Sequence, residues 1–203
     1  MTTPLPPSDL DSLRPTITAI AKGSTFHRFY SLGDGKARYD PIYFDRGRGG
    51  RLNAPPAARY GVLYASQNIE GAFAETFLRS RGRTLVPSDL IERKGYATLR
   101  ATRELAFVNL FGPGLARLGA TAEVVHGGMP YDVPQAWSAA IRSMRIKPDG
   151  IAYYARHDDE QLCYAIFGPR PRSVAEVRRI EDIDQDWFYD LCQTYDVGVS
   201  PRG

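Results

Sequence analysis

A strand that turns directly into a helix limits the possible folds of this chain more than any other stretch. Residues 61–65 form a short apolar run, and Ser66 then precedes a helical pattern over residues 67–79. Serine often caps a helix N-terminus, so Ser66 predicts that the strand passes straight into the helix. Residues 33–58, before the strand, are rich in Gly, Pro, Asp and Arg, which predicts a long loop. Long loops in small domains are usually functional or disordered.

Short strands and helices alternate along the rest of the chain, which predicts an α+β fold. A chain of 203 residues with 43% hydrophobic residues can bury one core, so we expect a single domain over residues 25–203. Residues 1–24 are expected to form an N-terminal arm with a short apolar segment at residues 17–20. Further strands are expected at residues 26–30, 95–101, 105–110, 150–154, 162–167 and 174–180, and helices at residues 114–118, 133–145 and 183–192.

Three of these elements carry more specific predictions. Residues 95–101 and 105–110 are separated by a short connection and predict a hairpin. Asp132 predicts a cap for the helix at residues 133–145, with Gln135 as its capping-box partner.

Cysteine, histidine and apolar patterns exclude several kinds of site. Cys163 and Cys192 are far apart and have no Cys or His neighbour at ligand spacing, so no disulfide framework or zinc site is expected. The three histidines are also scattered, and we expect no metal or other cofactor. No apolar run approaches the roughly 20 residues of a membrane span, and the first residues lack a signal-peptide pattern. The sequence therefore predicts a cytoplasmic protein without a membrane partner.

Arginine dominates the basic residues of a chain whose net charge is +3. Arginine suits bidentate contacts with anions, although coding bias or general solvation also explains its abundance. The arginine cluster at residues 79–83 is short and is followed by Asp89 and Glu92, so we interpret it as a solvated helix end. Direct nucleic-acid binding is not expected.

Three side chains from the loop, the strand and the helix form a candidate site. Arg51 can grip a pyrophosphate, Tyr64 can stack on a flat heterocycle, and Glu75 can stabilise a developing sugar cation. Together they suggest chemistry on a dinucleotide. Each also has an ordinary structural alternative: Arg51 can pair with Asp45, Tyr64 can be a plain sheet aromatic, and Glu75 can face solvent on its helix.

A set of short motifs, taken in order, resembles the RES-domain proteins, which are toxins of bacterial RES and Xre toxin-antitoxin pairs. The likeness covers a core at residues 26–167 and implies a fold similar to diphtheria-toxin-type ADP-ribosyltransferases, with a split central β-sheet flanked by helices and an NAD cleft. The matching residues are Arg28 and Phe29, Arg51 to Asn53, Leu63 to Ser66, Ala72 to Glu75, Asp149 to Tyr153, and Arg156 to Asp158.

The resemblance implies that the protein cleaves the nicotinamide–ribose bond of NAD+, by hydrolysis or phosphorolysis, and so depletes cellular NAD. It implies catalytic roles for Glu75, Arg51 and Tyr64. Arg28 and Arg51 would bind the pyrophosphate, Tyr64 would contact nicotinamide, and Tyr153 and His157 would belong to the same NAD site. The implied partner is a cognate Xre-like helix-turn-helix antitoxin that blocks the cleft, in a toxin-antitoxin hetero-oligomer.

One position departs from the family pattern. The family usually has a serine where this chain has Ala155. If that hydroxyl contacts the nicotinamide end of the substrate, its loss removes one hydrogen bond, worth about 0.5 to 1.5 kcal/mol. Two alternatives to NAD depletion stay open: mono-ADP-ribosylation of a specific protein and, because of Ala155, a catalytically silent binding module.

Overall fold

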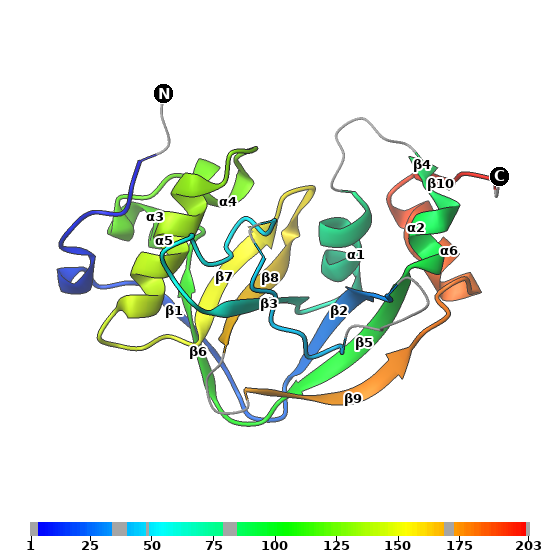
Figure 1. Cartoon of the computed structure of the whole chain (residues 1–203), viewed down its shortest axis with the longest axis horizontal. Coiled ribbons are helices and arrows are strands. Elements are labelled where there is room, and N and C mark those ends of the chain that lie inside the picture. Colours follow the sequence, from blue (N-terminus) through cyan, green and yellow to red (C-terminus); the bar gives the residue numbers. More distant parts are fainter. Residues whose placement is uncertain (1–3, 34–39, 48, 79–84, 169–172, 202–203) are drawn as a thin grey trace.

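The computed structural model describes residues 4–33, 40–47, 49–78, 85–168 and 173–201 (Figure 1). The strands are β1 Ile17–Ile20, β2 Thr25–Ser31, β3 Gly61–Ser66, β4 Leu85–Val86, β5 Lys94–Ala101, β6 Leu105–Asn109, β7 Gly150–Ala155, β8 Asp158–Gly168, β9 Val174–Ile180 and β10 Gly198–Val199. The helices are the 3-10 turn η1 Leu10–Ser12 and the α-helices α1 Ile69–Phe77, α2 Ser88–Glu92, α3 Pro113–Leu118, α4 Glu123–His126, α5 Asp132–Ser143 and α6 Asp186–Thr194.

Within the described residues, eight strands form one central sheet in the order β1-β6-β7-β8-β3-β2-β5-β9. Neighbouring strands of this sheet run antiparallel except for β6 and β7, which are parallel. Strands β2 and β3 share a single registered pair in the described part of the chain, His27 with Ser66. The two strands therefore diverge beyond this pair, and the sheet splits into a β1-β6-β7-β8-β3 half and a β2-β5-β9 half.

The two halves of the sheet fold toward each other through an aromatic core. Phe26 of β2 contacts Tyr164 of β8 and Phe107 of β6, with ring centroids 5.3 and 6.5 Å apart. Several strands separate β2 from β6 in the sheet order, so these contacts require the sheet to curl. Each of the three rings is at most 1% exposed, so they anchor the interior between the halves.

Separate groups of helices cover the two halves of the sheet (Figure 1). Helix α5 packs Trp137 and Ile141 against the β6-β7-β8 half. Helices α1 and α6 pack against β2 and β5 through a second aromatic cluster, in which Phe73 and Phe77 contact Phe188 at 5.6 and 5.0 Å. The predicted α+β fold with a central sheet flanked by helices is confirmed.

The predicted hairpin of residues 95–101 and 105–110 is wrong. The two strands form, but β5 pairs with β2 and β9, whereas β6 pairs with β1 and β7. Asp149 fixes the connection: its carboxylate accepts hydrogen bonds from the Arg103 guanidinium at 2.5 and 3.0 Å and from the Ala106 N–H at 3.0 Å. These contacts direct β6 to the start of β7, in the other half of the sheet.

Other boundaries differ by a few residues. The N-terminal segment predicted as an arm contributes β1, an edge strand that pairs with β6. Helix α1 begins two residues later than predicted, because Ser66 still belongs to β3 and Asn68 occupies the N-cap position. Helix α5 begins at Asp132 itself, and Gln135 does not form the predicted capping box. Its side chain donates instead to the carbonyl of Gly50 at 3.1 Å.

The arginine cluster at residues 79–83 lies outside the described residues. Among those described, no helix is both long and apolar enough to span a membrane.

Candidate functional site

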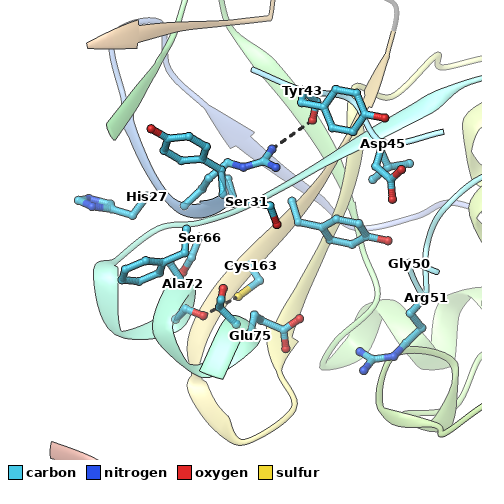
Figure 2. Close-up of a pocket in the computed structure, with 18 of the residues that line it drawn as sticks. His27, Ser31, Tyr43, Asp45, Gly50, Arg51, Ser66, Ala72, Glu75 and Cys163 are labelled. Atoms are coloured by element: carbon cyan, nitrogen blue, oxygen red, sulfur yellow. Dashed lines mark hydrogen bonds between the residues drawn. The ribbon is translucent and has the colours of Figure 1, made fainter. Parts of the chain in front are cut away.

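A cleft of about 660 Å³ opens where β2 and β3 diverge. It is bounded by these two strands, helix α1 and the loop before β3, and Tyr153 and Cys163 reach it from β7 and β8. Figure 2 shows Tyr43, Arg51 and Glu75 on different sides of this opening. Five of the six side chains assigned to an NAD site from the sequence line the cleft: Arg28, Arg51, Tyr64, Glu75 and Tyr153.

A buried asparagine holds the loop wall of the cleft. Asn53 is fully buried, and its amide nitrogen donates to Asp45 Oδ2 and to the Gly47 carbonyl, both at 2.8 Å. Its Oδ1 accepts a hydrogen bond from the Tyr64 hydroxyl at 2.9 Å. A side chain at Gly50 would collide with the Asn53 amide, so a glycine is needed there. Because the network satisfies a buried amide, it fixes the loop against β3.

The Tyr64 hydroxyl also contributes to this network. It accepts a hydrogen bond from the Leu52 N–H at 2.8 Å while it donates to Asn53. The hydroxyl is therefore used to hold the turn that contains Arg51. Tyr64 remains half-buried and lines the cleft, so its ring borders the space available to a ligand.

Arg51 extends from this fixed turn toward helix α4. Its guanidinium donates to the Val125 carbonyl and lies 5.8 Å from the ring centre of Tyr131. Its Nε is buried and has no hydrogen-bond partner within the described residues. The predicted alternative, an ion pair with Asp45, is not formed, because Asp45 binds Asn53 and the Gly47 N–H. Arg51 thus keeps bonding capacity for an anion in the cleft.

Arg28 occupies the β2 side of the cleft. One of its terminal nitrogens donates to the Tyr43 carbonyl at 3.3 Å, and its buried Nε has no partner within the described residues. Burial lowers the pKa of the Arg28 guanidinium to about 10, although the nearby Asp45 and Asp40 carboxylates favour the charged form. An anion bound in the cleft would relieve this loss of solvation.

Glu75 projects from α1 and is held by two donors from β7 and the turn that follows it. The Tyr153 hydroxyl donates to Oε2 at 3.2 Å, and the Arg156 N–H donates to Oε1 at 3.1 Å. The solvent-facing alternative for Glu75 is therefore wrong. Gly71 permits this close approach of α1 to the sheet, because a side chain there would collide with Ser66.

Tyr153 is 1% exposed, and its hydroxyl reaches the cleft at Glu75. Burial raises the pKa of Tyr153 well above its ordinary value, and the Glu75 carboxylate raises it further. Tyr153 therefore stays protonated and donates its hydrogen bond to Glu75 over the physiological pH range.

Two positions singled out from the sequence lie elsewhere. His157 is exposed in the turn between β7 and β8 and does not line the cleft, because β7 ends at Ala155, before His157. Ala155 is fully buried in the apolar cluster beneath α5 and is also absent from the cleft wall. The missing family hydroxyl is therefore replaced by apolar packing.

Sequence reasoning gave no role to several residues that line the cleft. His27 binds the Tyr96 hydroxyl through Nδ1 at 2.6 Å, and Lys94 donates to Ser31 at 2.8 Å. Burial lowers the pKa of His27, so its neutral form is favoured. Only the register between β2 and β5 brings Ser31 opposite Lys94, and no local sequence signal indicates this.

Cys163 is 1% exposed and lies in the cleft wall close to Glu75. Burial raises the pKa of its thiol, so it is an unreactive neutral group. Among the described residues, no group of His, Cys, Asp and Glu side chains is arranged to hold a metal ion.

The family model of the RES domain matches residues 28–191, which include every residue that lines the cleft except His27. The chain belongs to the RES-domain family. Among solved structures, this RES protein is similar to a chain in the crystal structure of the M. tuberculosis MbcT-MbcA toxin-antitoxin complex. The two share 16% sequence identity with a TM-score of 0.63, over 86% of this chain and 92% of the other. At this identity the likeness establishes the fold alone. No curated protein matches the chain.

Proposed function

We propose that this RES protein is a toxin that breaks the bond between nicotinamide and ribose in NAD+. The observation that carries the proposal is the meeting, in one cleft, of two arginines that form no ion pair within the described residues and one carboxylate fixed by two donors. Membership of the RES family supports the same conclusion.

The arginines suit the charged part of NAD+. Arg28 and Arg51 lie on different elements that border the cleft, and each has one terminal guanidinium nitrogen that makes no hydrogen bond within the described residues. Arginine binds phosphate oxygens through paired donors, so the two side chains would hold a pyrophosphate in place of its water shell. Binding there would orient the rest of the dinucleotide for reaction.

The fixed carboxylate suits the bond that breaks. As the C–N bond to nicotinamide lengthens, its electron pair moves to the nicotinamide nitrogen and positive charge develops on the ribose. Nicotinamide leaves as a neutral group, so the step needs no general acid. Glu75, held by the Tyr153 hydroxyl and the Arg156 N–H, would stabilise the sugar cation without reorienting during the reaction. Water or phosphate then adds to the cation. NAD+ is thus a substrate, and the reaction requires no further cofactor.

A toxin of this kind needs a partner that restrains it in the cell that produces it. The similar M. tuberculosis chain comes from a toxin-antitoxin complex. We therefore expect a cognate antitoxin of the Xre-like helix-turn-helix type that covers the cleft, in a hetero-oligomer. In such a complex the antitoxin carries the DNA-binding function.

Expression in bacteria tests the proposal. Wild type, Glu75→Gln and a control, Glu92→Gln, would be induced in a host without antitoxin, and total NAD measured within the first hour. Glu92 is an exposed glutamate of α2 outside the cleft. We expect NAD to fall and growth to stop with wild type and Glu92→Gln, but not with Glu75→Gln. Unchanged NAD in all three strains, with ADP-ribose attached to a host protein, would point to a transferase instead.

A further inference from the structure

The C-terminal helix supports the helix that carries Glu75. Helix α1 lies between the β7–β8 hairpin and α6 (Figure 1). At the end of α6, Tyr195 stacks on Phe73 of α1 with ring centroids 5.4 Å apart and an interplanar angle of 7°. Phe73 is fully buried, so this stack is part of the aromatic cluster that fixes α1. Tyr195 lies beyond residues 28–191, the stretch matched by the RES family model.

The Tyr195 hydroxyl reaches past α1 to the start of β8. It donates a hydrogen bond to Asp158 Oδ2 at 2.6 Å, and it also lies 3.3 Å from the Glu70 carbonyl oxygen of α1. Burial raises the pKa of Tyr195, and the Asp158 carboxylate raises it further, so the hydroxyl remains a donor. One hydroxyl thus ties the C-terminal helix to both α1 and β8.

Asp158 begins β8, directly after the tight turn that presents a donor to Glu75. Its other oxygen accepts the Glu160 N–H at 3.1 Å, and its backbone is in register with Ala155 across the turn. Between these two residues lies Arg156, whose N–H donates to Glu75 Oε1 at 3.1 Å. A displacement of Asp158 would move this N–H relative to the carboxylate, because only two residues form the turn.

We propose that Tyr195 is a positioning residue for Glu75, which acts through Asp158 and the Arg156 N–H. The proposal rests on the proposed function for its catalytic consequence. Its structural part, that Tyr195 holds the Arg156 N–H on Glu75, stands independently. The role follows from geometry: Tyr195 bridges the two elements, α1 and the β7–β8 turn, whose separation sets the Glu75–Arg156 hydrogen bond.

Two matched variants of the full chain test the proposal. Tyr195→Phe keeps the ring that stacks on Phe73 and removes the hydroxyl. Tyr189→Phe removes a hydroxyl from the same helix, one that donates to Asp184 at 2.5 Å, and Tyr189 does not line the cleft. The measurements are the hydrogen-exchange rate of the Arg156 amide by NMR, and kcat and KM for nicotinamide release from NAD+.

We expect Tyr195→Phe to raise the exchange rate of the Arg156 amide and to lower kcat by about tenfold with little change in KM, because the loss of a charge-assisted hydrogen bond is of this size. Tyr189→Phe should alter neither. In a Glu75→Gln background, Tyr195→Phe should cause no further loss of kcat, since residues that act through one group are not additive.

Three results would overturn the proposal. Unchanged exchange at Arg156 in Tyr195→Phe would refute the structural link. Faster exchange with an unchanged kcat would refute its catalytic consequence. An equal loss of kcat in the wild-type and Glu75→Gln backgrounds would show that Tyr195 acts through another group. If wild type releases no nicotinamide, the proposed function fails, and the exchange rate still decides whether Tyr195 holds the turn.

Discussion

The two walls of the cleft are built in different ways. The loop wall uses residues close in sequence: Asn53 and Tyr64 bind each other at 2.9 Å and bind the loop backbone around Arg51. The helix wall uses residues far apart in sequence, since Glu75 is held by Tyr153 and Arg156, 78 and 81 positions away. The first wall is held by hydrogen bonds between residues close in sequence. The position of Glu75 in the second wall depends instead on the pairing of strands across the sheet.

This difference separates folding roles from chemical roles within one short motif. Asn53 is fully buried, and its side chain binds Asp45, Gly47 and Tyr64, which belong to the loop and β3, so it acts in folding. Arg51, two residues earlier, lines the cleft and keeps an unpartnered Nε within the described residues. A motif that pairs an arginine with an asparagine thus combines a ligand-binding residue with the residue that fixes its position.

The largest effect on stability should follow from removing the hydrogen bonds that hold the loop wall. Asn53→Ala would leave Asp45, the Gly47 carbonyl and the Tyr64 hydroxyl without their partner. We expect a loss of about 2 to 3 kcal/mol in the free energy of unfolding, which corresponds to roughly 5 to 10 °C in melting temperature. Thermal denaturation followed by circular dichroism measures it.

Asn68→Ala is the control for this measurement. Asn68 is exposed at the N-cap position of α1, but its side chain makes no capping hydrogen bond. Its replacement should change the melting temperature by less than a third of the Asn53→Ala effect. Equal losses of melting temperature in the two variants would contradict the role of Asn53 in fixing the loop against β3.

A smaller effect, confined to ligand binding, should follow from Arg28→Lys. Lysine keeps the charge but lacks the Nε–H and the planar fork, so it loses the paired contacts with a pyrophosphate. We expect KM for NAD+ to rise about tenfold, with a smaller change in kcat. Steady-state kinetics of nicotinamide release measure both. Arg46→Lys, at an exposed arginine outside the cleft, should change neither constant. An unchanged KM in Arg28→Lys would remove Arg28 from the binding site.

How far the sequence predicts this molecule depends on the range of the contacts involved. The turn from β3 into α1 and the Arg51 loop depend on nearby residues, and their predicted order is confirmed. The pairing of β5 and β6 was predicted wrongly, because Asp149, far along the chain, directs β6 to β7. The resemblance supplied Tyr153, but only the sheet register explains why its hydroxyl meets Glu75. His157 was assigned to the site by its place in a motif, but it lies exposed in a turn and does not line the cleft.

The smallest effect should come from the position that departs from the family pattern. Ala155 is fully buried in apolar packing and does not line the cleft, so Ala155→Ser should change kcat by less than about threefold while an added buried hydroxyl costs some stability. Ala152→Ser is a matched control. Ala152 belongs to the same strand, β7, and is also fully buried, but it packs in the apolar cluster on the opposite face of the sheet from Ala155. A tenfold gain of activity in Ala155→Ser alone would show that the missing hydroxyl acts in catalysis after all.

The most direct test of the central claim is nicotinamide release from NAD+ by purified wild type and Glu75→Gln, followed by chromatography. The account predicts that wild type releases nicotinamide as NAD+ disappears. It predicts that Glu75→Gln, with an unchanged melting temperature, is slower by a factor on the order of 10² to 10³, as expected for the loss of a fixed charge that stabilises the transition state. Equal rates from the two proteins, or no release by wild type, would contradict the account.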